Sequence, residues 1–191
     1  MVAKPILFLD RDGTILVEPT DDFRIKSIDR FHFMPNVIEA LKKIHSFHLY
    51  YFVLVSNQDG LGRESYPVEY FEPFQEMMLQ VLSSNGISFY DIHIDETTIQ
   101  DNKNTRKPGI GMLTKYIENQ DIFDIKNSIV IGDSRTDIQL AKNLGCASIL
   151  IENEHNIESY NSFTEVEAKT ILFRSNSWEK IRDFIVNLQH V

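Results

Sequence analysis

The sequence predicts an α/β fold in which a mainly parallel sheet lies between two layers of helices. Short apolar runs of strand length alternate with segments whose apolar residues recur at helical spacing. The expected strands are residues 5–9, 50–55, 87–94, 128–131, 147–151 and 170–173. Polar clusters follow directly after three of these runs, which is where open α/β sheets place their chemistry.

Helices are expected at residues 36–47, 67–85, 110–119 and 138–144, and the chain should end in an amphipathic helix. The apolar stripe of that last helix is Trp178, Ile181, Ile185 and Leu188. The polar stretch 152–169 predicts no definite element. We find no internal repeat and no linker, so the 191 residues are expected to form a single domain.

Composition and charge narrow the class of protein. Hydrophobic residues make up 42% of the chain and charged residues 25%, as in ordinary globular proteins. The net charge of -9 disfavours nucleic acid and anionic membrane surfaces as partners. No apolar run approaches the ~20 residues that span a bilayer. Because Asp10, Arg11 and Asp12 interrupt the first apolar run, no signal peptide is expected either.

Cysteine usage points to a reducing compartment. Cys146 is the only cysteine, so neither an intramolecular disulfide nor a cysteine-rich zinc site can form. We expect a cytoplasmic protein in which Cys146 is a small buried residue.

Two carboxylates follow the first strand. Residues i and i+2 of an extended chain share a face, so Asp10 and Asp12 can enter one pocket. One can attack as a nucleophile while the other moves protons. Together with the Asp12 backbone carbonyl, they also offer hard oxygen ligands for Mg²⁺. Gly13 permits the turn, and Thr14 offers a hydroxyl to an anion. The alternative is a solvated Asp-Gly turn, so the motif requires support from the rest of the chain.

Two later segments carry groups suited to phosphate. Ser56 and Asn57 follow the second apolar run, where hydroxyl, amide and backbone N–H donors could hold phosphate oxygens. Lys107 precedes Pro108 at the mouth of an expected helix, where a fixed cation could neutralise phosphate and nucleophile together. Taken singly, the first segment could be a Ser/Asn/Gly turn and the second a solvated basic pair.

A fourth segment follows the run 128–131. Asp133 stands where it could meet Asp10 and complete an oxygen-ligand site for Mg²⁺. Asp137, four residues further on, lies near the start of the next helix. It could complement the helix dipole and also support the site.

Together these four segments resemble the motifs of the haloacid dehalogenase-like (HAD) phosphohydrolases, over about residues 6–151. In detail they are similar to histidinol-phosphatases, the phosphatase half of bifunctional histidine-biosynthesis enzymes. The matching stretches are Asp10-Arg11-Asp12-Gly13-Thr14 with Glu18-Pro19, Ser56-Asn57-Gln58-Asp59-Gly60-Leu61-Gly62, Arg106-Lys107-Pro108, and residues 132–141. Heptose-bisphosphate phosphatases share Asn-Gln-x-Gly but typically carry Ser at the position of Asp59.

The chain departs from that pattern in two respects. We expect the dehydratase half of the bifunctional enzymes to be absent. The loop before Arg106 often carries three Cys and one His around zinc in these enzymes, but residues 93–105 here contain no Cys, so no structural zinc is expected. The segment between the second and third motifs leaves no room for a cap domain. Loops 18–23, 59–66 and 95–105 would then select the substrate.

The resemblance implies phosphomonoester hydrolysis through an aspartyl-phosphate. Asp10 would attack phosphorus, while Asp12 protonates the leaving alcohol and then activates water. Mg²⁺ would be held by Asp10, the Asp12 carbonyl and Asp133. The transferring group would be held by Ser56, Asn57 and Lys107, with Thr14 and Asp137 in support.

Three further residues are expected to face the substrate, namely Glu18, Asp59 and Arg106. Histidinol phosphate carries an amine and an imidazole, which the acids Glu18 and Asp59 would suit; solvated loop acids are the alternative. The competing functions are a sugar-phosphate phosphatase, heptose bisphosphate being the leading case, and a non-catalytic HAD-like binding module. The acidic charge disfavours a nucleic-acid 3′-phosphatase. The sequence predicts no oligomeric state.

Overall fold

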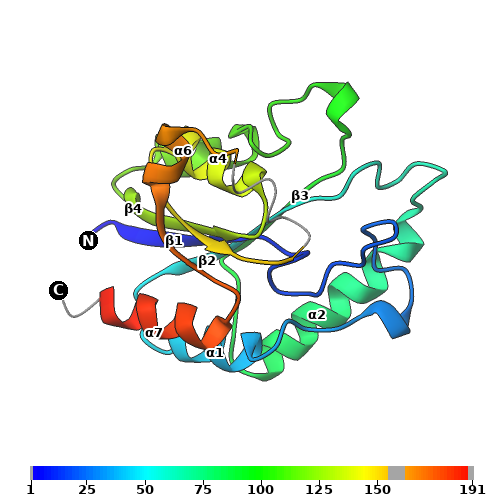
Figure 1. Ribbon diagram of the computed structural model, residues 1–191, viewed down its shortest axis with the longest axis horizontal. Coiled ribbons are helices and arrows are strands. Elements are labelled where there is room, and N and C mark those ends of the chain that lie inside the picture. Colours follow the sequence, from blue (N-terminus) through cyan, green and yellow to red (C-terminus); the bar gives the residue numbers. More distant parts are fainter. Residues whose placement is uncertain (1, 155–161, 189–191) are drawn as a thin grey trace.

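The computed structural model describes residues 2–154 and 162–188, and a parallel sheet runs through its centre (Figure 1). In the described ranges the sheet has six strands in the order β3-β2-β1-β4-β5-β6. They are β1 Lys4–Leu9, β2 Tyr51–Asn57, β3 Asp91–Asp95, β4 Phe123–Gly132, β5 Ala147–Ile151 and β6 Ile171–Ser175. The chain builds outward from β1 to β3, then returns to β4 on the other side of β1. That reversal opens a crevice beyond the carboxyl ends of β1 and β4.

Helices cover both faces of the sheet, which gives the expected three layers (Figure 1). The helices α1 Val37–His45, α2 Glu72–Ser84 and α7 Trp178–Leu188 pack on one face. The helices α3 Thr114–Glu118, α4 Arg135–Leu144 and α6 Glu165–Thr170 lie on the other. Short 3-10 helices occur at η1 Ile28–Arg30, η2 Val68–Tyr70, η3 Ile99–Asp101 and η4 Gly111–Leu113.

The central strand shows why an apolar run, rather than an alternating pattern, marks these strands. Leu7 and Leu9 of β1 enter the core under α1 and α7, while Ile6 and Phe8 enter the core under α3 and α4. All four side chains are fully buried. A strand covered on both faces is apolar at every position.

Several element bounds differ from the sequence-based expectation. The run 87–94 yields a strand only from Asp91, because Ile87 N still bonds the carbonyl of Leu82 and closes the end of α2. The expected helix 110–119 is divided into η4 and α3, and the N–H of Gly111, at the start of η4, bonds the carbonyl of Asn104. At the end of α7, Leu188 is 39% exposed, whereas the other three residues of the expected stripe are buried.

Two further contacts bear on the site. The indole Nε1 of Trp178, at the start of α7, donates to the carbonyl of Thr14 at 2.9 Å. This bond ties the last helix to the turn that follows β1. Between β2 and Arg106, the chain forms only η2, α2, β3 and η3, so this segment contributes no separate cap. No helix in the described residues is long and apolar enough to cross a membrane.

Candidate active site

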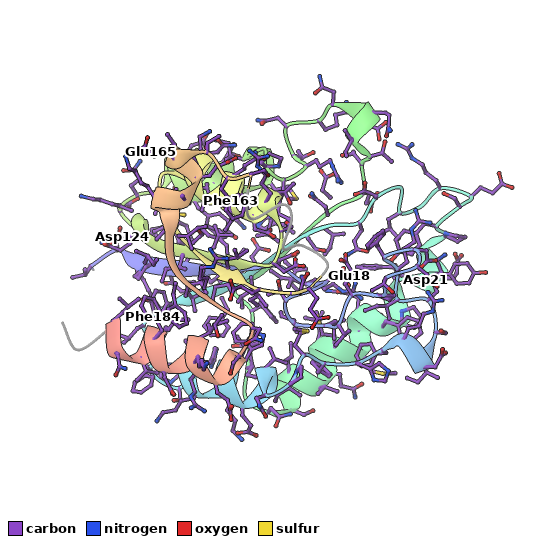
Figure 2. All side chains as sticks on the ribbon, viewed as in Figure 1. Glu18, Asp21, Asp124, Phe163, Glu165 and Phe184 are labelled. Atoms are coloured by element: carbon purple, nitrogen blue, oxygen red, sulfur yellow. The ribbon has the colours of Figure 1, made fainter. Side chains whose placement is uncertain are left out.

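A cleft of about 440 Å³ opens beyond the carboxyl ends of β1, β2 and β4. Nine of the eleven residues predicted for the site line it. They are Asp10, Asp12, Glu18, Ser56, Asn57, Asp59, Arg106, Lys107 and Asp133. Figure 2 shows Glu18 beyond the carboxyl ends of the strands, whereas Asp124, near the start of β4, lies at the opposite end of the sheet. Segments far apart in the sequence therefore meet at one place, as the strand-end argument predicts.

Lys107 is the buried cation at the centre of the cleft. Its side chain is 3% exposed, and Nζ lies 2.7 Å from Oδ1 of Asp10 and 2.8 Å from Oδ1 of Asp137. Burial alone lowers the pKa of Lys107, but attraction to Asp10 and Asp137 outweighs it, so the pKa is raised overall. The ammonium stays charged and can hold negative charge that enters the cleft.

Asp10 is a largely buried carboxylate with charged neighbours. Burial raises its pKa to about 7, the Lys107 ammonium opposes that rise, and the carboxylate of Asp137 adds to it. Burial and the charges of Asp10 and Asp137 also raise the pKa of Asp133 well above its ordinary value. Negative charge at this position therefore exceeds what Lys107 can balance, and a further cation would relieve the repulsion.

The donor set fits a hard divalent cation. Asp10, Asp133 and Asp137 each offer a carboxylate oxygen, and these oxygens lie within 4.8 Å of one another. Carboxylate oxygens in this arrangement suit Mg²⁺. Asp137 is the least available of the three, because Lys107 bonds its Oδ1 and Ser134 bonds its Oδ2. The Asp12 carboxylate is not part of this group; the sequence-based prediction assigned its backbone carbonyl to the metal.

Two glycines allow the strand ends to approach these carboxylates. A Cβ built on Gly13, whose φ is +72°, would lie 2.3 Å from Oδ2 of Asp133. A Cβ on Gly132 would lie 2.2 Å from Cγ of Asp137. Any larger residue at either position would displace a carboxylate of the site.

Asp137 has both of the roles considered for it. It is the third residue of α4, and its Oδ2 accepts from the backbone N–H of Ser134 at 3.1 Å and from the Ser134 hydroxyl at 2.6 Å. This is a capping box. Its Oδ1 accepts from Lys107. The start of α4 is thus joined directly to the cation of the cleft.

Asn57 differs from the role expected of its side chain. Its Nδ2 donates to the carbonyl of Lys107 at 3.1 Å, and its Oδ1 accepts from the backbone N–H of Lys107 at 2.9 Å. The amide therefore positions the backbone of Lys107 against the end of β2. In this structure the amide is occupied, which leaves phosphate binding to other donors of this segment.

Asp12 is held by two donors. Arg11 Nη1 contacts both of its carboxylate oxygens, at 2.7 and 2.9 Å, and Gln58 Nε2 donates to Oδ2 at 2.6 Å. Gln58 Nε2 also donates to the hydroxyl of Ser56 at 2.8 Å. The second aspartate of the first motif is thereby connected to the serine at the end of β2.

Thr14 does not line the cleft. It is fully buried, and its hydroxyl has no hydrogen-bond partner among the described residues. The expectation that this hydroxyl would contact an anion in the cleft therefore does not hold in this structure. The tight turn at Gly13 carries the side chain into the core, and Thr14 supports the site through its carbonyl bond to Trp178.

The expected substrate-facing residues, Glu18, Asp59 and Arg106, all line the cleft. Burial, together with the charges of Asp12 and Asp10, raises the pKa of Glu18 to about 8. The carboxylate of Asp59 is 45% exposed and pairs with Arg106 Nη1. The Arg106 guanidinium therefore offsets part of the negative charge of Asp59, which we expected to face a cationic substrate.

The loop that lacks zinc ligands is ordered by hydrogen bonds. Asp101 Oδ2 accepts from the Thr98 backbone N–H at 2.7 Å and the Thr98 hydroxyl at 2.8 Å, which caps η3. Arg63 contacts the same oxygen at 2.5 Å. Arg106 Nη1 donates to the carbonyl of Thr97 at 3.1 Å. The loop is therefore fixed against the same arginine that faces the cleft.

Sequence reasoning missed several residues that line or support the cleft. Phe23, Arg24, Gln58, Tyr66 and Thr136 line it. Arg11 lies beneath it, 1% exposed, with its guanidinium carbon 4.9 Å from the centre of the Phe71 ring. Gln58 lies inside the motif 56–62, so the sequence places it near the site. Its contacts could not be predicted, because they form only when distant segments of the chain fold together.

Comparisons with known proteins give the family of the chain. A family described as "Polynucleotide kinase 3 phosphatase" matches residues 5–158. The "Histidine biosynthesis bifunctional protein HisB" of Bacteroides fragilis is 42% identical over 96% of this chain and 48% of its own length. The protein of that name from Spirosoma linguale is 39% identical over 94% of this chain. This chain thus spans about half the length of these relatives.

Solved structures share the fold. The D,D-heptose 1.7-bisphosphate phosphatase from B. bronchiseptica, complexed with magnesium and phosphate, superposes with a TM-score of 0.78 at 24% identity. The match covers 98% of this chain and 99% of that one. The D,D-heptose 1,7-bisphosphate phosphatase from Burkholderia Thailandensis gives a TM-score of 0.61 at 21% identity. The chain belongs to the polynucleotide kinase 3 phosphatase family of HAD-like phosphatases.

Proposed function

We propose that this protein hydrolyses a small phosphomonoester, histidinol phosphate being the foremost candidate, through an aspartyl-phosphate on Asp10. The observation that carries the chemistry is the contact of Lys107 Nζ with Asp10 Oδ1 inside a cleft of carboxylates. Lys107 holds Oδ1, so we assign Oδ2 to the attack on phosphorus. The P–O bond to the alcohol breaks as the bond to Asp10 forms.

Asp12 moves the protons in both steps. In the first step its carboxyl group gives a proton to the departing alkoxide, and the alcohol leaves. In the second step its carboxylate takes a proton from water as the water oxygen attacks phosphorus. The bond between Asp10 and phosphorus then breaks, which releases inorganic phosphate and restores both aspartates.

Mg²⁺ is the cation that the site fits, with Asp10, Asp133 and the Asp12 carbonyl as its protein ligands. When bound, it neutralises charge on the phosphoryl group and on the carboxylates around it. Lys107 and Ser56 hold the phosphoryl oxygens from the protein side. Asn57 fixes Lys107 rather than touching the phosphate, which revises its expected role.

The choice of substrate rests on two supports. The relatives named HisB match almost all of this chain, and their printed name places them in histidine biosynthesis. Asp59 lines the cleft, where its carboxylate favours a substrate with amine and imidazole groups, and a cationic group bound near Glu18 would favour ionisation of the Glu18 carboxyl. The net charge of -9 also favours a small molecule over a nucleic-acid end, whatever the family's name.

Phosphate release by the purified protein with Mg²⁺ tests this proposal. Histidinol phosphate and heptose bisphosphate are compared at matched concentrations, with Asp10→Asn as the inactive reference. A strong preference for histidinol phosphate that Asp10→Asn abolishes supports the proposal. Preference for the sugar would retain the chemistry and overturn the substrate. No release from either ester would favour a binding module.

A further inference from the structure

We propose that Gln58 is a positioning residue that joins Asp12 to Ser56, and that Tyr66 fixes the orientation of its amide. This inference rests on the proposed function, because it takes Asp12 as the proton donor and Ser56 as a phosphate ligand. Neither Gln58 nor Tyr66 has a role in the mechanism derived above. Both line the cleft, and both are nearly inaccessible to solvent, at 5% and 1% exposed.

Both ends of the Gln58 amide are hydrogen-bonded within the site. Nε2 donates to Oδ2 of Asp12 at 2.6 Å and to Oγ of Ser56 at 2.8 Å. Oε1 accepts from the hydroxyl of Tyr66 at 3.1 Å. An amide nitrogen carries two protons, so one Gln58 side chain sets the positions of two functional groups at once.

The orientation of this amide follows from the chemistry of its neighbours. The NH₂ end faces Oδ2 of Asp12 and Oγ of Ser56, and the oxygen faces the hydroxyl of Tyr66, so every contact pairs a donor with an acceptor. Burial raises the pKa of Tyr66 to about 12, so its hydroxyl keeps its proton and remains a donor at neutral pH. Removal of that donor would leave the buried Oε1 without its partner.

The backbone of Gln58 is fixed as well. Its N–H donates to the carbonyl of Asp95 at 2.7 Å, at the end of β3, and its carbonyl accepts from Leu61 N at 3.0 Å. The buried Arg11 also contacts Asp12, at both of its carboxylate oxygens. Asp12 is therefore held between Arg11 and Gln58 in a single position.

This arrangement has a consequence for Ser56. Its Oγ accepts a hydrogen bond from Gln58, so its own O–H proton is available for another acceptor. In the proposed reaction that acceptor is a phosphoryl oxygen. Gln58 therefore places the proton donor at a set distance from the phosphate that Ser56 binds, which is the geometry that proton transfer to a leaving group requires.

The leaving group provides the test. An alkyl phosphate needs protonation of its departing alkoxide, whereas p-nitrophenyl phosphate releases a stable phenolate and needs little help. Displacement of Asp12 should therefore reduce kcat/KM for histidinol phosphate more than for p-nitrophenyl phosphate. A defect that merely loosened the fold or the phosphate site would reduce both to a similar degree.

The variants are Gln58→Leu and Tyr66→Phe, assayed on both esters with Mg²⁺. Gln75→Leu is the matched control, because Gln75 is also buried, at 8% exposed, and its amide has no hydrogen-bond partner in the described residues. Thermal unfolding of each variant is measured beside the kinetics. For Gln58→Leu we expect kcat/KM to fall about 10- to 100-fold more on the alkyl ester than on the aryl ester. Tyr66→Phe should show the same pattern more weakly, and Gln75→Leu should show no such difference.

The outcomes separate this inference from the proposed function. If kcat/KM of Gln58→Leu falls equally on the two esters, or does not fall, the positioning role of Gln58 is overturned. Turnover by the wild type would still support the proposed phosphatase function. Absence of turnover by the wild type would overturn both. If Gln58→Leu does not fold, Tyr66→Phe decides, because it removes one hydroxyl and keeps the ring between Arg24 and Phe71.

Discussion

Lys107 Nζ lies 2.7 Å from Asp10 and 2.8 Å from Asp137, so one buried ammonium joins the first strand to the first turn of α4. The Asn57 side chain fixes the Lys107 backbone from the end of β2. The ends of β1 and β2 and the start of α4 thus depend on one residue for their relative placement. This relationship explains how a polar centre can be rigid although its carboxylates repel one another.

Lys107→Met should abolish most activity. It removes a preorganised cation from the phosphoryl group and leaves Asp10 and Asp137 facing each other without compensation. We expect kcat to fall by about 100-fold or more. The change should also lower the free energy of unfolding in the absence of metal. Rates of phosphate release and thermal unfolding measure the two effects.

Lys126→Met is the matched control for Lys107→Met. Lys126 is exposed, and it lies near the amino end of β4, whereas the cleft lies beyond the carboxyl end of that strand. Its rate should stay near that of the wild type. A Lys107→Met protein with near-normal kcat would contradict the assignment of Lys107.

Glu18 should make the metal-free protein less stable at high pH. Its pKa is raised from 4.5 to about 8 in the folded state, so its stabilising contribution is complete below the ordinary value of 4.5 and is lost as pH rises through 8. Glu18→Gln cannot ionise. The free energy of unfolding of the variant, relative to that of the wild type, should therefore rise as the pH increases from 4.5 to 8. The difference should be largest above pH 8.

Urea unfolding in EDTA across this pH range measures the Glu18 difference. Glu64→Gln, at an exposed position, controls for the loss of one negative charge. A difference between Glu18→Gln and wild type that is constant with pH would show that Glu18 is already ionised in the folded protein.

Mg²⁺ should stabilise the wild-type protein against heat. A ligand that binds the folded state raises the unfolding temperature, and the repulsion among Asp10, Asp133 and Asp137 adds to the gain. Asp133→Asn removes one proposed ligand and one negative charge. We expect this variant to be at least as stable as wild type in EDTA but to gain much less from Mg²⁺. Equal gains in the two proteins would place the cation elsewhere.

Asp59→Ser should change substrate preference through Arg106. In the wild type, the Asp59 carboxylate pairs with the guanidinium of Arg106 at the wall of the cleft. The substitution removes a negative charge and frees a positive one. KM for histidinol phosphate should rise several-fold, whereas a bisphosphate should bind more tightly.

Asp22→Ser is the control for Asp59→Ser, since Asp22 also lines the cleft but is paired with Lys26 and Arg30. It should change the preference less than Asp59→Ser. An unchanged preference for cationic esters in Asp59→Ser would remove Asp59 from substrate selection.

The strand ends and the cluster of carboxylates beside them could be predicted because both depend on local spacing. Asp10 and Asp12 share a motif, and Asp133 follows a buried run, so topology alone brings them to one edge. The extent of helix 110–119 could not be predicted in the same way. Gly111, at the start of η4, bonds the carbonyl of Asn104, a residue of the preceding loop, and periodicity carries no signal for that contact.

The finer roles in the site depend on contacts across the chain. Asn57 faces Lys107 from 50 residues away, and Gln58 meets Asp12 across 46. Composition and periodicity carry no signal for such pairs. Thr14 illustrates the opposite case, because a motif position implied a role that the turn at Gly13 excludes by directing the side chain inward.

The central claim is that Asp10 becomes phosphorylated, and trapping that intermediate tests it most directly. Wild-type protein is mixed with histidinol phosphate and Mg²⁺, quenched in acid within a turnover, digested and mapped by mass spectrometry. The account predicts one phosphoryl group on the peptide that contains Asp10, labile to hydroxylamine and absent from Asp10→Asn. Steady phosphate release without any phosphoryl group on that peptide, or release by Asp10→Asn at the wild-type rate, would contradict it.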